Sequence, residues 1–246
     1  MPADDLHSPA RAYDELAATY TDDVESNAYN AHIVFPAITD LLGDVSGQQL
    51  LDAGCGTGAY STWLTDQGAS VVGIDCSTEM LARARDRLDG DGDVLRADLN
   101  EPLGFADDSF DGIVSSLAVS YIRDWDALFR EFARVCRSGG WLVIATTHPF
   151  DEFGTENEDA QNYFDIERCT KSWDVEIPYY RRPLEAMIQP ILDAGFAIES
   201  VVEPQPTAAF AERRPDRYAK ESRQPVFFCL NARRRKRSSE TNSNQK

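Results

Sequence analysis

Lysine is scarce in this chain, which also lacks long apolar runs and closely spaced cysteine pairs. Lysine and arginine together number 24, against 42 aspartate and glutamate residues, so the formal net charge is −18. Binding to nucleic-acid phosphates requires a basic face, so no nucleic-acid partner is expected. No apolar run reaches the roughly 18 residues that cross a membrane, so no membrane association is expected. The cysteines are scattered without a Cys-x-x-Cys pair, so we expect neither a disulfide framework nor a metal site.

The first residues of the chain are acidic and contain no apolar signal-peptide region, so we expect a cytoplasmic location. The excess of acidic charge repels itself in dilute solution. Concentrated salt screens that repulsion, because the Debye length shortens to about 3 Å at 1 M. The composition therefore favours the salt-rich cytoplasm of a halophilic, salt-adapted organism. It gives no prediction of the oligomeric state.

A glycine-rich segment gives the clearest indication of a ligand. A short apolar run predicts a strand, which leads through Asp52-x-Gly54-x-Gly56-x-Gly58 into a predicted helix. Glycines permit a sharp turn close to a ligand, and the helix N-terminus offers free N–H groups and a positive dipole. Gly54-x-Gly56-x-x-Ala59 also fits the dinucleotide fingerprint, so an NAD-dependent oxidoreductase is one alternative. The carboxylate of Asp52 disfavours a pyrophosphate and favours a cationic ligand.

This segment resembles the first motif of the class I S-adenosylmethionine-dependent methyltransferases, in their small-molecule, methyltransferase type 11-like branch. Alternating strand and helix signals independently predict an α/β fold. The resemblance implies a Rossmann-like, doubly wound, seven-stranded, mostly parallel sheet with an antiparallel last strand near residues 226–230. It also implies an N-terminal helical cap over residues 8–43 and a substrate lid over residues 148–183, after the fifth strand. We expect a single methyltransferase domain over residues 1–231, and the composition of residues 232–246 predicts a basic, polar, disordered tail.

The resemblance implies S-adenosylmethionine as cofactor. It assigns the ribose hydroxyls to Asp75, because one carboxylate accepts two hydrogen bonds from a diol; a helix N-cap is the alternative role. Asp98 is expected to accept the adenine amino proton, with a turn residue as the alternative. Tyr20 is expected to cover the amino-acid end of the cofactor, or else to be buried in a helix interface. The other implied cofactor-binding residues are Asp52, Ala53, Gly54, Cys55, Gly56, Gly58, Cys76, Met80, Leu99, Ser116 and Leu117.

Methyl transfer demands mainly that the protein hold the acceptor in line with the methyl group and exclude water. His148, after the fifth predicted strand, is the candidate general base because the pKa of histidine lies near neutrality; a structural histidine is the alternative. The candidates for binding substrate are Tyr121, Tyr179, Tyr180 and Arg182. We expect in-line transfer of a methyl group to a small-molecule acceptor. A protein that binds S-adenosylmethionine without catalysis is the other alternative.

Thermal unfolding in increasing KCl tests the prediction of salt adaptation. We expect the Tm to rise between about 0.1 M and 1 M KCl, since the Debye length falls from about 10 Å to about 3 Å. A parallel titration with sucrose separates charge screening from the general stabilisation by excluded solutes. A Tm that stays constant or falls as KCl rises would contradict salt adaptation.

Overall fold

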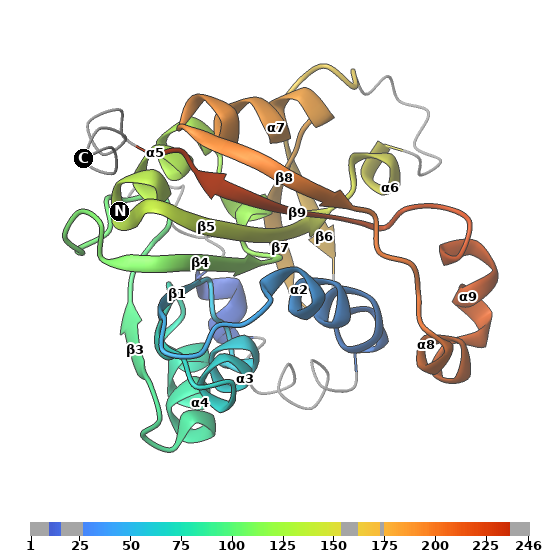
Figure 1. Ribbon diagram of the computed structural model, residues 1–246. Helices are drawn as coiled ribbons and strands as arrows, with labels where there is room; N and C mark the ends of the chain where they lie inside the picture. Colours follow the sequence, from blue (N-terminus) through green and yellow to red (C-terminus); the bar gives the residue numbers. More distant parts are fainter. Residues whose placement is uncertain (1–9, 16–26, 154–161, 173–174, 237–246) are drawn as a thin grey trace.

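A seven-stranded mixed sheet forms the centre of the molecule (Figure 1). This computed structural model describes residues 10–15, 27–153, 162–172 and 175–236. The strands of the sheet are β1 (Gln49–Ala53), β2 (Ser70–Asp75), β3 (Asp93–Arg96), β4 (Phe110–Ser116), β5 (Cys136–Thr147), β8 (Phe196–Val202) and β9 (Phe227–Arg234). Their order is β3-β2-β1-β4-β5-β9-β8, and β9 runs antiparallel to both β5 and β8. The predicted Rossmann-like, mostly parallel sheet with an antiparallel last strand is confirmed.

Helices cover both faces of this sheet. α5 and α7 lie on one face, and α2, α3 and α4 lie on the other (Figure 1). Their bounds are α2 (Phe35–Leu42), α3 (Ala59–Asp66), α4 (Thr78–Leu88), α5 (Trp125–Val135) and α7 (Leu184–Asp193). Shorter segments are a π-helical turn (Asn30–Val34) before α2, a 3-10 turn (Val119–Tyr121), α6 (Pro149–Phe153), α8 (Ala208–Arg213) and α9 (Pro215–Glu221). Among the described residues, no helix is both long and apolar enough to cross a membrane.

Adjacent strand residues belong to two separate hydrophobic cores, because successive side chains of a strand point to opposite faces. In β1, Leu51 packs on the side of α5 and α7, whereas Leu50 packs on the side of α2 and α3. Ile144 and Val143 of β5 divide in the same way. Each of these four side chains is at most 1% exposed. A sheet buried on both faces gives the loops at its carboxyl edge a rigid base.

Side-chain caps determine where two of the helices begin. Ser77 accepts the N–H of Met80 at the start of α4, and Asp124 accepts the N–H of Ala127 at the start of α5. Each cap satisfies an N–H group that has no partner within the first helical turn. α4 therefore begins directly after β2, which keeps residues 75–77 at the edge of the sheet where β2 ends.

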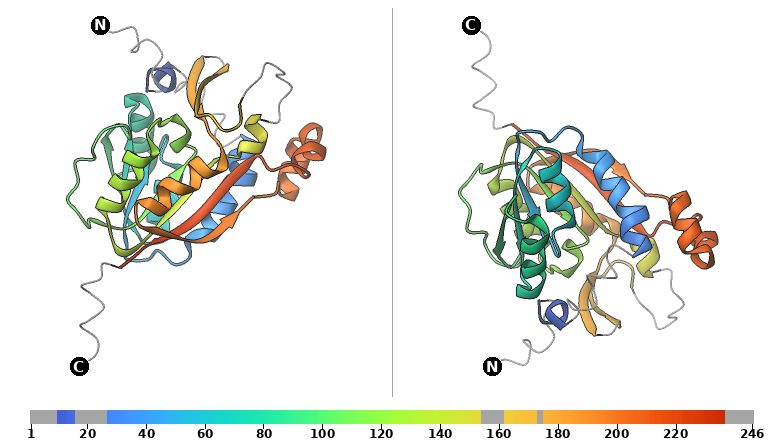
Figure 2. Two further views of the ribbon diagram at one scale, coloured as in Figure 1. Left: turned by 90° about the horizontal axis from the view of Figure 1, so that it is seen from above. Right: turned by 90° about the horizontal axis from the view of Figure 1, so that it is seen from below.

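β6 (Glu167–Ser172) and β7 (Glu176–Arg181) form a separate antiparallel hairpin within the segment predicted as a lid. β7 lies beside the helical residues 10–15 (Figure 2), where Ala12 and Ile177 share a small buried cluster. Residues 16–26 of the predicted cap and 154–161 of the predicted lid lie outside the described residues. The functions of the cap and the lid therefore stay predictions.

At its C-terminal end the sheet extends further than the sequence indicated. β9 runs to Arg234, and Ala232 within it is fully buried. Arg234 is also buried, and its guanidinium donates to the carboxylate of Asp108 and to the carbonyl of Cys136. The predicted start of the disordered tail at residue 232 is therefore wrong, and residues 237–246 lie outside the described residues. The basic composition did not indicate this end of the strand, where the buried Ala232 and Arg234 alternate with the exposed Arg233.

A glycine in β4 makes room for a large side chain of the neighbouring strand. Gly112 pairs with Trp141 of β5, and a Cβ built on Gly112 would lie 2.0 Å from the indole ring. The indole N–H donates to Oε1 of Gln48 at 2.9 Å, which fixes the ring across the strand. Position 112 therefore has no space for a side chain while Trp141 keeps this position.

Gly112→Ala is expected to lower the free energy of unfolding by about 1–3 kcal/mol, the usual cost of overpacking. Gly104→Ala is the matched control, because a Cβ there would meet no atom within 4 Å. Urea unfolding of both variants and of the parent chain measures the difference. Equal losses in the two variants would show that the contact between Gly112 and Trp141 is not the cause.

Candidate functional site

Two neighbouring cavities lie at the carboxyl ends of the parallel strands, which is where open α/β sheets bind ligands. The first contains about 830 Å³ of atom-free space, including its open mouth. Predicted site residues that line it are Gly54, Gly56, Asp75, Cys76, Met80, Asp98, Leu99, Ser116, Leu117 and Tyr121. Residues that the sequence did not assign to the site complete the wall, namely Ala10, Tyr13, Ala97, Asn100, Ala118 and Ile122.

The loop between β1 and α3 requires glycine at two positions that line this cavity. Gly54 has a φ of +81°, and a Cβ on it would lie 2.2 Å from that of Ala118. Gly56 has a φ of +54°, and a Cβ there would meet no atom within 4 Å. The N–H groups of Gly54 and Cys55 both donate to the carbonyl of Ile74, which ties the loop to β2. A ligand can therefore approach the backbone at Gly56.

Asp75 ends β2 and connects that strand to the glycine loop. Its Oδ2 accepts the N–H of Gly56 at 2.9 Å, and its Oδ1 accepts the N–H of Ser77 at 2.9 Å. Burial raises the pKa of Asp75, and the backbone hydrogen bonds oppose that shift. A carboxylate offers about four lone-pair directions, and Asp75 lines the cavity, so its oxygens are suited to accept hydrogen bonds from a ligand's hydroxyl groups. Ser77 rather than Asp75 caps α4, so the structure does not favour the alternative role of a helix cap.

Asp98 and Met80 contribute a polar and an apolar side chain to the same cavity. Met80 is 1% exposed and lies in the first turn of α4. Oδ1 of Asp98 accepts both the backbone N–H and the side-chain amide of Asn100, each at 2.9 Å. Asp98 is therefore a turn residue, which is the alternative role that the sequence allowed. It is also part of the cavity wall. The spacing Asp98-x-Asn100 is typical of such a turn and could have indicated Asn100.

Leu117 has a φ of +58°, which is an unusual backbone conformation for a residue with a side chain. Its N–H donates to the carbonyl of Ala145 in β5 at 2.8 Å, and this bond holds the strained backbone in place. Such strain costs about 1–3 kcal/mol and is characteristic of ligand sites. Ser116 lines the first cavity, whereas Leu117 lines both cavities. The strained turn thus places Leu117 at the junction between them.

The helical residues 10–15 cover part of the first cavity. The hydroxyl oxygens of Tyr13 and Tyr121 are 2.6 Å apart, and their rings meet edge to face with centroids 5.5 Å apart. Asp14 accepts the hydroxyl of Ser77 at 2.6 Å. These two contacts attach the segment to the 3-10 turn after β4 and to the beginning of α4. Tyr13 thus belongs to the wall through a contact between residues that are far apart in the sequence.

Asp52 lies beneath the glycine loop and does not line the cavity, contrary to expectation. Its side chain is 1% exposed and accepts the hydroxyl of Ser61 in α3 at 2.6 Å. Burial raises the pKa of Asp52 to about 6. Ala53, Cys55 and Gly58 also lie outside the cavity wall. Gly58 is instead the N-cap residue of α3, with a φ of +79°.

A second cavity adjoins the first and contains about 1830 Å³ of atom-free space, including its open mouth. Tyr13, Leu117 and Tyr121 line both cavities. The other residues that line the second cavity are Asn27, Ala28, Tyr29, Asn30, Ser120, Thr147, Asp151, Lys171, Arg213, Arg214, Arg217, Lys220, Glu221, Val226 and Phe227. The shared residues place this cavity next to the end of β4.

His148 follows β5 but lines neither cavity. Thr147 lines the second cavity, and successive side chains of a strand point in opposite directions. Nε2 of His148 lies 3.0 Å from Oε1 of Glu203, and Nδ1 accepts the N–H of Phe150 at 3.0 Å. Burial lowers the pKa of His148, which suits a neutral ring that donates through Nε2. The structure supports the structural role of His148 and not that of a general base.

Arg182 also has a structural role, and it lines neither of the two cavities. It is 2% exposed, and its guanidinium donates to the carbonyl of Ile122 at 2.7 Å. The same guanidinium stacks on Trp125, 4.1 Å from the ring centroid. The prediction that Arg182 contacts substrate is therefore not supported, because tertiary packing buries it against α5. Tyr20, predicted to cover the cofactor, lies outside the described residues.

Of the predicted substrate-binding tyrosines, Tyr121 alone lines these cavities. Tyr179 lies beneath Lys171, whose ammonium nitrogen is 4.5 Å from the centroid of the phenol ring. Tyr179 therefore supports a residue of the second cavity instead of lining it. Tyr180 pairs with Arg168 in the hairpin and lines neither cavity.

Comparison with known proteins identifies a methyltransferase domain over residues 51–144. The demethylmenaquinone methyltransferase of Beutenbergia cavernae is 36% identical over 157 residues, which are 61% of this chain and 62% of that protein. The methyltransferase GfsG of Streptomyces halstedii is 44% identical over 108 residues, which are 42% of this chain and 39% of that protein. The chain thus spans less than two thirds of the length of either curated relative.

A solved structure is similar over almost its whole length. The S-adenosylmethionine-dependent methyltransferase of Mesorhizobium loti has a TM-score of 0.66 and 30% identity, covering 84% of this chain and 98% of that chain. This similarity extends beyond the matched domain to the helices and strands on either side of it. The chain therefore belongs to the S-adenosylmethionine-dependent methyltransferases, a family whose cofactor is S-adenosylmethionine.

Proposed function

We propose that this chain transfers a methyl group from S-adenosylmethionine to a small-molecule acceptor by in-line displacement. The lining of the first cavity is the main support for this proposal. A ligand there can approach the backbone of Gly56, and Asp75 and Asp98 contribute carboxylates to the wall. A carboxylate beside the loop suits a ligand with hydroxyl and ammonium groups better than a pyrophosphate. Family membership favours the same activity over an NAD-dependent oxidoreductase and over binding without catalysis.

The residues of the first cavity fit S-adenosylmethionine by their chemistry. Asp75, which lines this cavity, would accept hydrogen bonds from the ribose hydroxyls through its carboxylate oxygens. Met80 offers a polarizable thioether to the adenine face, and Asp98 offers an acceptor for the adenine amino group. Cys76 and Leu99 complete this part of the wall, and Ser116 and Leu117 would meet the methionine end.

The chain contributes to methyl transfer by positioning and by excluding water. When bound, S-adenosylmethionine supplies a methyl group whose bond to sulfur breaks as the acceptor's lone pair forms a new bond to carbon. Leu117 and Tyr121 lie at the junction of the two cavities, where an acceptor in the second would face a cofactor in the first. Tyr13 covers that junction through its hydroxyl contact with Tyr121.

The hydroxyls of Tyr13 and Tyr121 are the polar side-chain pair that we propose to orient the acceptor. Since either hydroxyl can be the donor in their mutual hydrogen bond, the pair can present a donor or an acceptor to a ligand. Because His148 interacts with Glu203 through Nε2, we assign no residue as a general base. An acceptor that ionises readily, or one without a proton to lose, needs none.

We also propose that the protein works in a salt-rich cytoplasm. The net charge of −18 supports this proposal, because concentrated salt screens the self-repulsion of the acidic surface. The same charge favours a small-molecule acceptor over a nucleic acid.

Asp75→Ala is expected to weaken the binding of S-adenosylhomocysteine by about 1.5–3 kcal/mol, the range for losing hydrogen bonds to a charged group. Isothermal titration calorimetry measures this change, with NADH titrated in parallel. Asp86→Asn, on the exposed surface of α4, is the control and should bind like the parent chain. Thermal unfolding without ligand shows whether Asp75→Ala remains folded. Unchanged affinity would remove Asp75 from the site, and binding of NADH alone would overturn the proposed function.

The raised pKa of Asp52 predicts a pH-dependent cost of burying its carboxylate. Its folded-state pKa of about 6 lies above the ordinary value of 3.8 for aspartate, so the folded protein binds more protons between these pH values. The contribution of Asp52 to stability therefore falls as the pH rises through that window. Asp52→Asn lacks this loss, so its stability relative to the parent chain should increase by roughly 3 kcal/mol between about pH 3 and 7.

Urea unfolding at a series of pH values measures this difference. Asp93→Asn, at the exposed start of β3, is the matched control and should leave the shape of the pH profile unchanged. Parallel profiles for Asp52→Asn and the parent chain would mean that Asp52 titrates in the folded protein as it does in the unfolded one.

A further inference from the structure

The second cavity gathers positive charge in a strongly acidic protein. Its cationic residues are Lys171, Arg213, Arg214, Arg217 and Lys220, and its carboxylates are Asp151 and Glu221. Five cations thus face two carboxylates, although the whole chain has a net charge of −18. A cleft lined by one sign of charge concentrates ligands of the opposite sign. The cavity therefore reverses locally the repulsion that the rest of the surface exerts on anions.

Two of these cations have room to bind a ligand. Arg214 is engaged with Asp216 through two hydrogen bonds of 3.1 and 3.0 Å. Nε of Arg217 lies 3.9 Å from that carboxylate, and Nζ of Lys220 lies 4.0 Å from Asp151. These separations exceed hydrogen-bond length, and the two side chains are 52% and 48% exposed. Arg217 and Lys220 can therefore donate hydrogen bonds to an anion without first breaking a hydrogen bond to Asp216 or Asp151.

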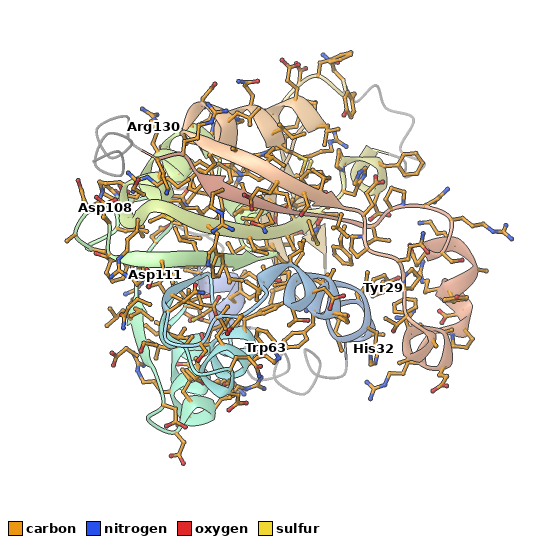
Figure 3. All side chains as sticks on the ribbon, in the orientation of Figure 1. Tyr29, His32, Trp63, Asp108, Asp111 and Arg130 are labelled. Atoms are coloured by element: carbon orange, nitrogen blue, oxygen red, sulfur yellow. The ribbon has the colours of Figure 1, made fainter. Side chains whose placement is uncertain are left out.

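The elements that carry most of these cations, α8 and α9, pack against the core of the protein. The hydroxyl of Tyr29 donates to Oε1 of Glu221 at 3.1 Å, and its ring packs edge to face with Phe210 at 5.1 Å. Figure 3 shows Tyr29 between the helical segment before α2 and the pair α8 and α9. Burial and Glu221 raise the pKa of Tyr29 to about 12, so its hydroxyl stays protonated and keeps donating. Lys171 reaches the cavity from the hairpin, where its ammonium lies over Tyr179 and 3.4 Å from the hydroxyl of Thr147.

We propose that the methyl acceptor carries an anionic group, a carboxylate or a phosphoryl group, which binds in the second cavity against Lys171, Arg217 and Lys220. This inference rests on the proposed function. Leu117 and Tyr121 line both cavities, so the reacting atom of such an acceptor would lie at the junction. The anionic group would lie toward α9 and the hairpin. Its role is to anchor and orient the acceptor, and the cations that hold it are binding residues without a part in bond making.

Binding of small anions to the full chain tests this inference. Malonate, its neutral counterpart malonamide, and inorganic phosphate are titrated at constant ionic strength, with and without saturating S-adenosylhomocysteine, and thermal stabilisation is measured. We expect saturable stabilisation by malonate or phosphate and none by malonamide. The better of the two anions distinguishes a carboxylate site from a phosphoryl site. Arg217→Gln combined with Lys220→Gln should weaken the anion at least tenfold while leaving the affinity for S-adenosylhomocysteine unchanged.

Arg130→Gln combined with Arg235→Gln removes the same charge from exposed positions that line neither cavity, and serves as the matched control. An equal loss in both double variants, or no saturable anion binding in the parent chain, would overturn the inference. Failure of S-adenosylhomocysteine to bind would overturn the proposed function instead. Because the anions are also titrated without that ligand, the two failures are distinguishable.

Discussion

The contact between the carboxylate of Asp75 and the N–H of Gly56 is the interaction on which the first cavity depends. It joins the end of β2 to the loop after β1, so two parallel strands are held in a fixed relation where they meet the ligand site. The second oxygen of Asp75 binds the N–H of Ser77, whose hydroxyl caps α4 and also donates to Asp14. Strand end, glycine loop, helix start and covering segment are thus connected through one short chain of hydrogen bonds.

The parts of this protein that the sequence predicted correctly are encoded in short, local patterns. The glycine loop, the strand before it and the acid ending the next strand lie within about one supersecondary unit, and they led to the confirmed fold, family and cofactor. Met80, Asp98 and Leu117 line the cavity as expected for the same reason. Each of them lies within two residues of the end of a strand or in the first turn of a helix whose position the pattern had already determined.

The misplaced residues depend on packing between segments that are distant in the sequence. His148 is turned away by Glu203, and Arg182 is buried by Trp125, and neither partner is visible in a local pattern. Alternation along β5 could have indicated that Thr147 and His148 face opposite sides. The second cavity could not be predicted locally, since contacts between distant segments, such as those of Tyr29 with Phe210 and Glu221, bring α8 and α9 into its wall.

The fit of Trp141 over Gly112 also constrains how this sequence can diverge. A larger residue at position 112 becomes acceptable only after the indole has been replaced by a smaller side chain, because the two occupy the same volume. A smaller residue at position 141 alone leaves a void beside β4 and an unpaired acceptor on Gln48. Both single steps are unfavourable, so the two positions should change together or remain as they are. Among homologues, the identity of one position should therefore carry information about the other.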